Sequence, residues 1–361
     1  MLDFVIIGAA QAGLSIAYEL KLRGYSFIIL DKENEIGASW LNRWDSLKLF
    51  TPAEFNNLKG LDFPAPKGSY PNKYEVADYF KSYVSHFDFP IQLNTLVTKV
   101  TKDKQIFKIF HDTSTIKSRH LIVATGPFHI PYIPRFSKNI SDHITQLHSN
   151  FYKKPEQLEK GKTLVVGDGD SGYQILDEIS RSTPNTVYFS GNTSVQTLPQ
   201  EILGKTLWWW FTITGFLSIS KDSWLGQKII NSRQPIIGTD VKAILFRQNV
   251  VCVGHTVDAN QTEVITEKEV LKDLRNIVWA TGYRPNFKWI KGLELDKDNY
   301  PAHKRGVSHM KGLFFIGLPW LHTRASATLG GVKEDAEYLV NQIEKHSQKE
   351  AAQEFPEAAT S

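Results

Sequence analysis

The chain has 361 residues, of which 41% are apolar and 22% are charged, and its formal net charge is +4. This is the composition of a globular protein, and the length predicts two domains at roughly 150 residues each. The charges are spread out, without the basic block that binds nucleic acid. No apolar run approaches the roughly 18–20 residues that cross a bilayer, and no basic leader opens the chain. We therefore expect a cytoplasmic protein without nucleic-acid partners or stable membrane insertion.

The only cysteine, Cys252, excludes an internal disulfide, a Cys-x-x-Cys redox pair and a zinc site built from cysteines. It lies in an apolar run with the pattern of a strand, so we interpret it as a small buried side chain.

The first part of the chain has the pattern of a strand–helix–strand unit. Residues 4–7 are a continuous apolar run that ends at Gly8, residues 14–23 have helical apolar spacing, and residues 27–30 are a second apolar run. Buried parallel strands joined by a crossover helix give this order. We expect one dinucleotide-binding fold to begin here.

The same order returns at residues 163–166, 171–182 and 186–189, which predicts a second dinucleotide-binding fold. Two apolar strands run into Ala-Thr-Gly, at 124–126 and 280–282, and prolines follow both. We expect the chain to cross between the two domains there. The predicted fold class is α/β, with two Rossmann-like domains, the second inserted into the first. The expected boundaries are 1–155 with 277–346, 156–276 for the inserted domain, and 347–361 for a polar tail.

The first glycine turn, residues 8–13, has the spacing of a dinucleotide fingerprint. Gly8 permits the tight turn and Gly13 permits close packing, while the helix N-terminus can hold a pyrophosphate. Ala10 stands where the middle glycine is usual. Asp31 follows Gly8 by 31 − 8 = 23 residues and can accept hydrogen bonds from a ribose diol. The alternative is an ordinary strand–turn–helix with a chance pair of glycines.

The second turn, residues 167–172, has all three glycines, Gly167, Gly169 and Gly172. The residues that should distinguish NADH from NADPH are 190–193. They include no arginine for a 2′-phosphate and no acid for a 2′-hydroxyl, which predicts a mixed preference. The alternative is that Arg181 or Lys205 reaches the site from elsewhere.

Two nucleotide sites in one chain indicate two cofactors between which a hydride passes, usually a nicotinamide and a flavin. Without a cysteine pair, the electrons must leave for oxygen or a soluble acceptor. The loop 37–52 carries Trp40, Trp44 and Phe50, and such aromatic side chains are costly to leave in water. The loop lines the flavin or packs on its own domain.

Four segments carry a resemblance to a known family: residues 37–52, residues 146–155 with Gln-Leu-His-Ser, residues 279–285 with Trp-Ala-Thr-Gly-Tyr-Arg-Pro, and residues 312–320. Their order and spacing resemble the flavin-containing monooxygenases, in particular the short bacterial CzcO-type branch, which is similar to the plant YUCCA enzymes. The match runs from residue 3 to about 345.

The resemblance implies FAD in the first domain and NADPH or NADH in the second. It implies that the segment 326–329 starts a helix aimed at the flavin pyrimidine. Phe50, Thr51 and Thr328 are the candidate catalytic residues. The candidate cofactor-binding residues are Gly8, Ala10, Gln11, Gly13, Asp31, Lys32, Trp40, Trp44, Thr51, Ala124, Thr125, Gly126, Gly167, Gly169, Ser171, Gly172, Ser190, Asn192, Thr193, Ala280, Thr281, Gly282, Ala327, Thr328 and Leu329.

The chain departs from the family in three places. Many members have an asparagine near the flavin, and its aligned position here is Phe50, whose ring cannot donate a hydrogen bond. We therefore expect some leakage of hydrogen peroxide. Asp142 and Ile144 stand where the family signature has Phe and Gly, and Ala10 replaces a glycine. His148 from that signature is expected to be a structural residue at the domain junction rather than a base.

The apolar segment 204–219 contains three consecutive tryptophans, Trp208 to Trp210. Three interpretations remain open: a helical roof on the substrate channel, a homodimer contact, and a helix at a membrane surface.

The resemblance implies a monooxygenase that consumes NAD(P)H and oxygen. It would form a flavin C4a-(hydro)peroxide and transfer one oxygen atom to a small sulfide, amine or ketone. One alternative is a flavin reductase or oxidase that passes electrons to a quinone, a dye or oxygen. The other is a nucleotide-binding sensor without turnover. The substrate and the oligomeric state are not determined by the sequence.

Overall fold

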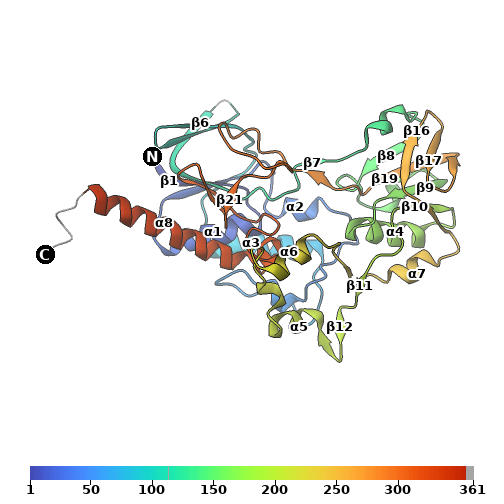
Figure 1. Cartoon of the computed structure of the whole chain (residues 1–361), viewed down its shortest axis with the longest axis horizontal. Helices are drawn as coiled ribbons and strands as arrows, with labels where there is room; N and C mark the ends of the chain where they lie inside the picture. The colour runs from blue at the N-terminus through green and yellow to red at the C-terminus, as the bar shows by residue number, and fades with distance from the viewer. Residues whose placement is uncertain (113, 355–361) are drawn as a thin grey trace.

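The structure is a computed structural model that describes residues 1–112 and 114–354. It contains two large sheets, one mixed and one parallel, at the two sides of Figure 1 and joined near β7 (Ile130–Pro131). β7 pairs with β20 (Tyr283–Arg284), so both connections between the sheets run side by side. Both connections begin directly after an Ala-Thr-Gly sequence.

The first sheet has the order β21-β22-β23-β6-β1-β2-β3, with β4 and β5 attached to β6. The inner strands β23, β6, β1, β2 and β3 are parallel. Their bounds are β1 Leu2–Ile7, β2 Phe27–Leu30, β3 Ile91–Gln92, β4 Val97–Asp103, β5 Ile106–His111, β6 Ser114–Val123, β21 His303–Lys304, β22 Val307–Ser308 and β23 Leu313–Phe315.

Helices α1 (Gln11–Leu22), α3 (Lys73–Phe87) and α8 (Val332–Glu354) pack together with one face of this sheet, and their apolar side chains share one core. The short helix α2 (Ala38–Leu41) and the turns η1 (Ala53–Phe55) and η5 (Arg324–Ala327) lie in the connecting loops. α8 continues to Glu354, so residues 347–354 of the expected polar tail belong to this helix. The rest of that expected tail, 355–361, lies outside the described residues.

The second sheet has the order β15-β10-β9-β19-β8, and all neighbours are parallel. The strands are β8 Thr145–His148, β9 Lys162–Val166, β10 Val187–Ser190, β15 Val250–Gly254 and β19 Leu274–Trp279, with helices α4 (Asp170–Ser182) and α7 (Val241–Leu245) and turns η2 (Arg135–Asn139) and η3 (Pro155–Gln157). A small antiparallel sheet, β16 (Thr256–Ala259), β17 (Glu263–Thr266) and β18 (Val270–Lys272), completes this unit.

The strand pairing moves both expected boundaries of the inserted unit. β8 and the whole of β19 belong to the second sheet, although boundaries at 155/156 and 276/277 assign β8 and residues 277–279 to the first. The chain crosses between the two units after Gly126 and after Gly282, since each Ala-Thr-Gly directly follows a strand, β6 or β19.

A segment of the inserted unit, residues 195–240, returns to the first unit, and we call it the lid. It contains β11 (Thr197–Leu198), β12 (Glu201–Ile202), β13 (Lys205–Thr206), α5 (Leu207–Ile213), η4 (Phe216–Ser218), α6 (Trp224–Ile230) and β14 (Ile236–Ile237). The lid forms the lower middle of Figure 1. It contacts the first unit through a bridge between Ser220 and Thr323 and a hydrogen bond from Lys221 N–H to the His322 carbonyl (2.8 Å).

Candidate active site

The turn after β1 accepts only glycine at two positions. Gly8 has φ +109°, and a Cβ there would lie 2.6 Å from the Ala124 carbonyl oxygen. A Cβ on Gly13 would lie 1.8 Å from the Gly8 carbonyl oxygen. These approaches bring the N-terminus of α1 directly against the ends of β1 and β6, as a dinucleotide turn requires.

The N-terminus of α1 has no side-chain cap, because Ala10 occupies the N-cap position. Helix N–H groups without a cap are suited to bind an anion such as a pyrophosphate. The Asp31 carboxylate lies beside this turn and accepts hydrogen bonds from Ala9 N–H (2.6 Å) and Glu33 N–H (2.9 Å). Lys32 is exposed and lies near Glu33. The residues therefore fit a nucleotide with a ribose close to Asp31.

The turn after β9 repeats this geometry. Gly167 has φ +125° and its Cβ would lie 2.2 Å from the Ala280 carbonyl oxygen, while a Cβ on Gly172 would lie 1.9 Å from the Gly167 oxygen. A Cβ on Gly169, in contrast, would meet no protein atom within 4 Å. The middle glycine therefore faces open space at the uncapped N-terminus of α4, where a pyrophosphate fits. Ala124 and Ala280 have equivalent roles in the two turns.

The chain after β10 differs in part from the expectation. Ser190 is buried, and its Oγ is bound to the Thr256 hydroxyl (2.7 Å) and to Thr256 N–H (2.8 Å), so it is a structural residue. The Asn192 carbonyl accepts a hydrogen bond from the Tyr173 hydroxyl (2.6 Å), and Thr193 is exposed.

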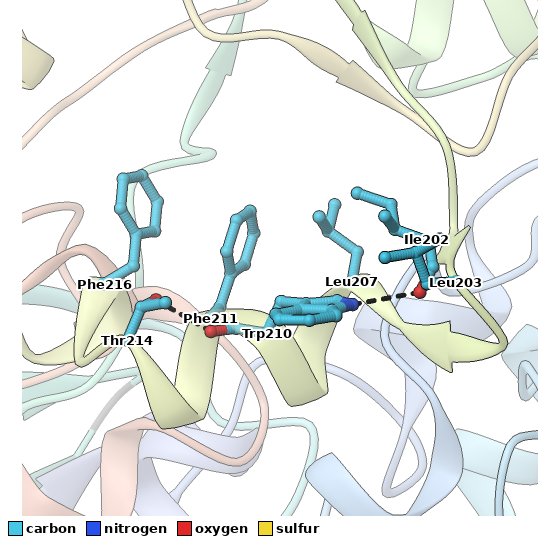
Figure 2. Close-up of a pocket in the computed structure, with 7 residues that line it drawn as sticks. All are labelled: Ile202, Leu203, Leu207, Trp210, Phe211, Thr214 and Phe216. Atoms are coloured by element: carbon cyan, nitrogen blue, oxygen red, sulfur yellow. Dashed lines mark hydrogen bonds between the residues drawn. The ribbon is translucent and has the colours of Figure 1, made fainter.

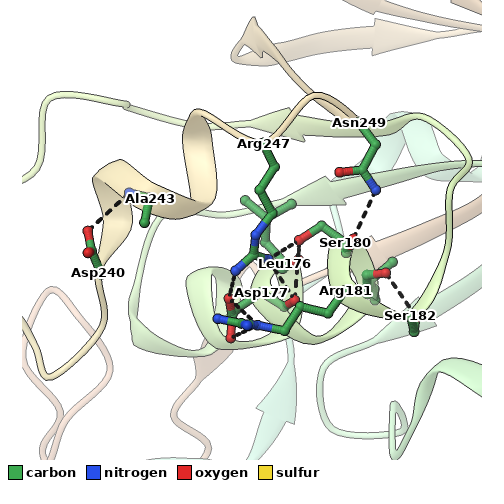
Figure 3. Close-up of polar contacts among 10 residues, drawn as sticks. Leu176, Asp177, Ser180, Arg181, Ser182, Asp240, Ala243, Arg247 and Asn249 are labelled. Atoms are coloured by element: carbon green, nitrogen blue, oxygen red, sulfur yellow. Dashed lines mark hydrogen bonds and ion pairs between the residues drawn. The ribbon is translucent and has the colours of Figure 1, made fainter.

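Neither Arg181 nor Lys205, the two cations considered from the sequence, lies beside residues 190–193. Arg181 bonds to Asp177 on the outer side of α4 (3.0 Å), where Arg247 also binds the same carboxylate (Figure 3). Lys205 lies over the Trp209 ring.

Thr51 lies in the loop before η1 and is held in place by Asn56, which follows η1. The Thr51 hydroxyl donates to Asn56 Oδ1 (2.7 Å), and Asn56 Nδ2 donates to the carbonyls of Thr51 (3.1 Å) and Pro52 (3.0 Å). Asn56 is fully buried. Asn56 is not among the residues predicted from the sequence, where the pair Asn56-Asn57 between two apolar residues gives no sign of which side chain is buried. Phe50 packs on Trp208 of the lid, with ring centroids 5.4 Å apart.

The segment before α8 contacts this loop. A Cβ on Gly330 would lie 2.0 Å from the Phe55 carbonyl oxygen, so the two backbones touch. The helix expected from Ser326 begins at Val332 instead, because residues 324–327 form the separate turn η5. Ser326 Oγ accepts from His322 and Thr323 N–H within that turn. The Thr328 hydroxyl donates to the Ala325 carbonyl (2.8 Å), and Leu329 is buried in the first core.

The two loop tryptophans differ in position. Trp40 is half-buried between the cores of the two units, whereas Trp44 is buried in the core of the second sheet beside Tyr152. Trp44 therefore ties the loop to the second unit, which differs from its expected role beside the flavin.

His148 lies at the junction and has both ring nitrogens engaged. Nε2–H donates to the Gly282 carbonyl (2.9 Å), and Nδ1 accepts from Asn150 N–H (3.1 Å). Burial lowers the pKa of His148, although the bond to Gly282 opposes this. A neutral, fully bonded imidazole is a structural group and not a base.

Asp170, in the first turn of α4, has an unusual environment. Burial raises the pKa of its carboxyl, and a hydrogen bond from Ile237 N–H offsets part of this effect. One carboxylate oxygen, Oδ1, has no hydrogen-bond partner among the described residues.

Asp170→Asn is expected to raise the stability at pH 7 by about 1–2 kcal/mol, because it removes a buried, incompletely bonded charge. A carboxyl with a raised pKa destabilises the fold only when ionised, so the gain should disappear as the pH falls through that pKa. Thermal unfolding from pH 4 to pH 8 measures this. Asp273→Asn, in an exposed carboxyl of the same unit, is the control and should change little. A gain that persists unchanged at pH 4 would contradict the explanation.

Within residues 1–112 and 114–354, no three His, Cys, Asp or Glu side chains gather as a metal site would require. In the same range none of the helices has the length and apolarity needed to cross a bilayer. The two equivalent glycine turns, each at the end of parallel strands, have the geometry of two dinucleotide-binding turns.

Comparisons with known proteins identify the family. The family described as pyridine nucleotide-disulphide oxidoreductase matches residues 5–201. A CzcO-like oxidoreductase from Geobacillus kaustophilus is 41% identical over 348 residues, which cover 96% of this chain and 99% of that protein. YUCCA7 of Arabidopsis thaliana, described as a probable indole-3-pyruvate monooxygenase, is 27% identical, with 99% of this chain and 90% of that protein covered.

Among solved structures, a flavin-containing monooxygenase from Stenotrophomonas maltophilia has a TM-score of 0.78 and 25% identity, and the match covers 96% of this chain and 99% of that one. The chain belongs to the flavin-containing monooxygenase family, in its CzcO-like branch, which confirms the resemblance noted from the sequence. The two-domain α/β fold and the oxidoreductase class are confirmed with it.

Proposed function

We propose that the protein is an FAD-dependent monooxygenase that uses NADPH or NADH to oxygenate a small apolar molecule with a soft nucleophilic atom or a ketone. FAD is assigned to the turn at Gly8 and NAD(P)H to the turn at Gly167. The observation that carries this proposal is the pair of equivalent glycine turns, each with a helix N-terminus free of side-chain caps. The overall balance is NAD(P)H + H⁺ + O₂ + substrate giving NAD(P)⁺ + H₂O + oxygenated substrate.

When bound, the nicotinamide supplies a hydride and the flavin supplies the chemistry that activates oxygen. The chain's own residues bind and orient these groups. Gly8 and Gly13 let the α1 N-terminus approach the pyrophosphate, Asp31 is placed for a ribose, and the Thr51 loop, held by Asn56, borders the site. None of these residues has to move a proton.

Exclusion of water is the role we assign to the lid. Leu207 and Trp208 of α5 are buried against Phe50 and Phe55 of the first unit. This packing supports the roof interpretation of the apolar segment, and a dry site protects an oxygen-activating flavin from losing peroxide.

The apolar character proposed for the substrate rests on the apolar side chains of the lid, which also form a groove of their own. A groove of about 400 Å³ runs along α5, and Figure 2 shows that its wall is almost entirely aromatic and aliphatic. Its Trp210 indole N–H is already bonded to the Ile202 carbonyl (3.0 Å). The lining residues are Ile202, Leu203, Leu207, Trp210, Phe211, Thr214 and Phe216.

The test is an account of oxygen and reducing equivalents. Purified protein loaded with FAD is given NADPH or NADH and ¹⁸O₂ with an aryl sulfide, a tertiary aryl amine or an aryl ketone. One ¹⁸O atom in the product for each NAD(P)H consumed supports the proposal. Peroxide equal to NAD(P)H consumed, with every substrate, contradicts it.

That second outcome would support the alternative of a flavin reductase or oxidase without oxygenation. Two observations favour this alternative: Phe50 carries no hydrogen-bond donor, and the Thr51 hydroxyl is already committed to Asn56. Membership in a family of oxidoreductases speaks against a sensor without turnover.

Trp208→Ala is expected to increase the fraction of NAD(P)H that ends as peroxide severalfold, because it removes the indole that covers Phe50. Trp209→Ala is the matched control, since Trp209 lies on the same helix but is exposed. Peroxide, oxygenated product and NAD(P)H consumption are measured together in the presence of a substrate that the parent protein oxygenates. Equal leakage in the two variants would contradict the assigned role of the lid.

A further inference from the structure

An arginine of the lid reaches the second glycine turn. Arg233 lies between α6 and β14, and its Nη2 is 2.6 Å from Asp168 Oδ1. Asp168 follows Gly167 directly and lies 233 − 168 = 65 residues before its partner. The arginine side chain is 45% exposed and the aspartate 27%. The pair is therefore accessible to a ligand from the solvent side.

The other oxygen of Asp168 is tied to the chain that follows β10. Oδ2 accepts a hydrogen bond from Asn192 N–H (2.7 Å), and a Cβ on Gly191 would lie 2.8 Å from Asp168 Cβ. Burial raises the pKa of the Asp168 carboxyl, but the bonds from Arg233 and Asn192 outweigh this and hold the pKa below its ordinary value. Asp168 thus carries a negative charge between the glycine turn and the residues after β10.

This position has a defined meaning in a dinucleotide fold. The residues after the second strand lie beside the adenosine ribose, where an acid accepts from the 2′-hydroxyl of NADH and an arginine accommodates the 2′-phosphate of NADPH. The segment 190–193 itself contains neither. Asp168 supplies an acid and Arg233 supplies an arginine beside this segment, although the two residues lie far apart in the chain.

We propose that Arg233 and Asp168 form the coenzyme-sorting pair of this enzyme. Arg233 leaves Asp168 to bind the 2′-phosphate of NADPH, whereas Asp168 accepts a hydrogen bond from the 2′-hydroxyl of NADH. Bidentate recognition by a guanidinium favours the phosphate, and the neighbouring carboxylate repels it, so that the unmodified protein accepts both coenzymes. This inference rests on the proposed placement of NAD(P)H in the second fold.

The test measures binding apart from turnover. Titration calorimetry on the FAD-loaded protein uses adenosine 2′,5′-bisphosphate and 5′-AMP as probes, and KM is measured for NADPH and NADH. Arg233→Gln is expected to weaken the bisphosphate and raise the KM for NADPH at least tenfold, with less than a twofold change for 5′-AMP and NADH. Asp168→Asn is expected to move the NADPH-to-NADH ratio of kcat/KM in the opposite direction.

Arg181→Gln is the matched control, because Arg181 lies on the outer side of α4 with Asp177 and should leave both ratios unchanged. Arg233→Lys keeps the charge and should restore part of the bisphosphate affinity, which keeps the test valid where Asp168→Asn disturbs the turn. If Arg233→Gln weakens the binding of both probes equally, or of neither, the inference about the pair is wrong, while the placement of NAD(P)H in the second fold is not affected. If the unmodified FAD-loaded protein binds neither probe, the placement of NAD(P)H in the second fold fails as well.

Discussion

Gly169→Ala is expected to weaken the binding of NADPH and NADH at least tenfold while leaving the fold intact. The added methyl group meets no protein atom within 4 Å, so the folded chain has room for it. The same methyl group would occupy the space through which a pyrophosphate approaches the N-terminus of α4. KM for both coenzymes, thermal unfolding and the FAD content measure the three parts of this prediction.

Gly172→Ala provides the contrast. Its methyl group would lie 1.9 Å from the Gly167 carbonyl oxygen, so the helix and the strand must separate and the unfolding temperature should fall sharply. A Gly169→Ala protein with unchanged coenzyme affinity would mean that the nucleotide does not cross this turn. A Gly172→Ala protein as stable as the parent would mean that the turn is looser than described.

The parts of the site that the sequence predicted are those governed by short spacing. Gly8, Gly13 and Asp31 lie within one strand–helix–strand unit, and local geometry dictates where they meet. The same holds for Gly167 and Gly172. The two Ala-Thr-Gly sequences were also informative, because each follows a central parallel strand and closes on a glycine turn.

The parts that the sequence did not predict depend on long-range pairing. β8 joins the second sheet beside β19, which follows it in the chain by more than a hundred residues. The four residues of β8 are too few for their pattern of apolar and polar side chains to predict which strand they pair with. The start of α8 was misplaced because residues 324–331 contain an isolated turn before the helix. Arg233 and Asp168 meet only because the lid folds back, which no local motif encodes.

The third position of the glycine turn is alanine in the first unit (Ala10) and glycine in the second (Gly169). Ala10 has an ordinary extended backbone (φ −92°), so the methyl group costs the fold nothing there. The Ala10 methyl group therefore occupies space at the first turn that the second turn leaves open at Gly169. We propose that contacts from the loop held by Asn56 compensate for this at the proposed FAD site.

Asn56→Ala is expected to destabilise the first unit by about 2–6 kcal/mol and to release FAD. The substitution leaves the buried Thr51 carbonyl and the Thr51 hydroxyl without partners, whereas the Pro52 carbonyl keeps its bond from Phe55 N–H, and each unsatisfied group costs roughly 1–3 kcal/mol. The loop that carries Phe50 then loses its anchor, so the packing under Trp208 is lost too. Thermal unfolding, the ratio of FAD absorbance to protein, and peroxide formation are the measurements.

Asn57→Ala is the matched control, because its side chain bonds to Asp62 and Phe63 rather than to the Thr51 loop. Thr51→Val removes only one of the three bonds, so its stability and FAD content should lie between those of the parent and of Asn56→Ala. This order follows from the number of buried groups left unpaired. An Asn56→Ala protein that keeps its FAD and leaks no more peroxide than the Asn57→Ala control would show that the loop does not border the flavin, and the FAD assignment at the first turn would then depend on the glycines and Asp31 alone.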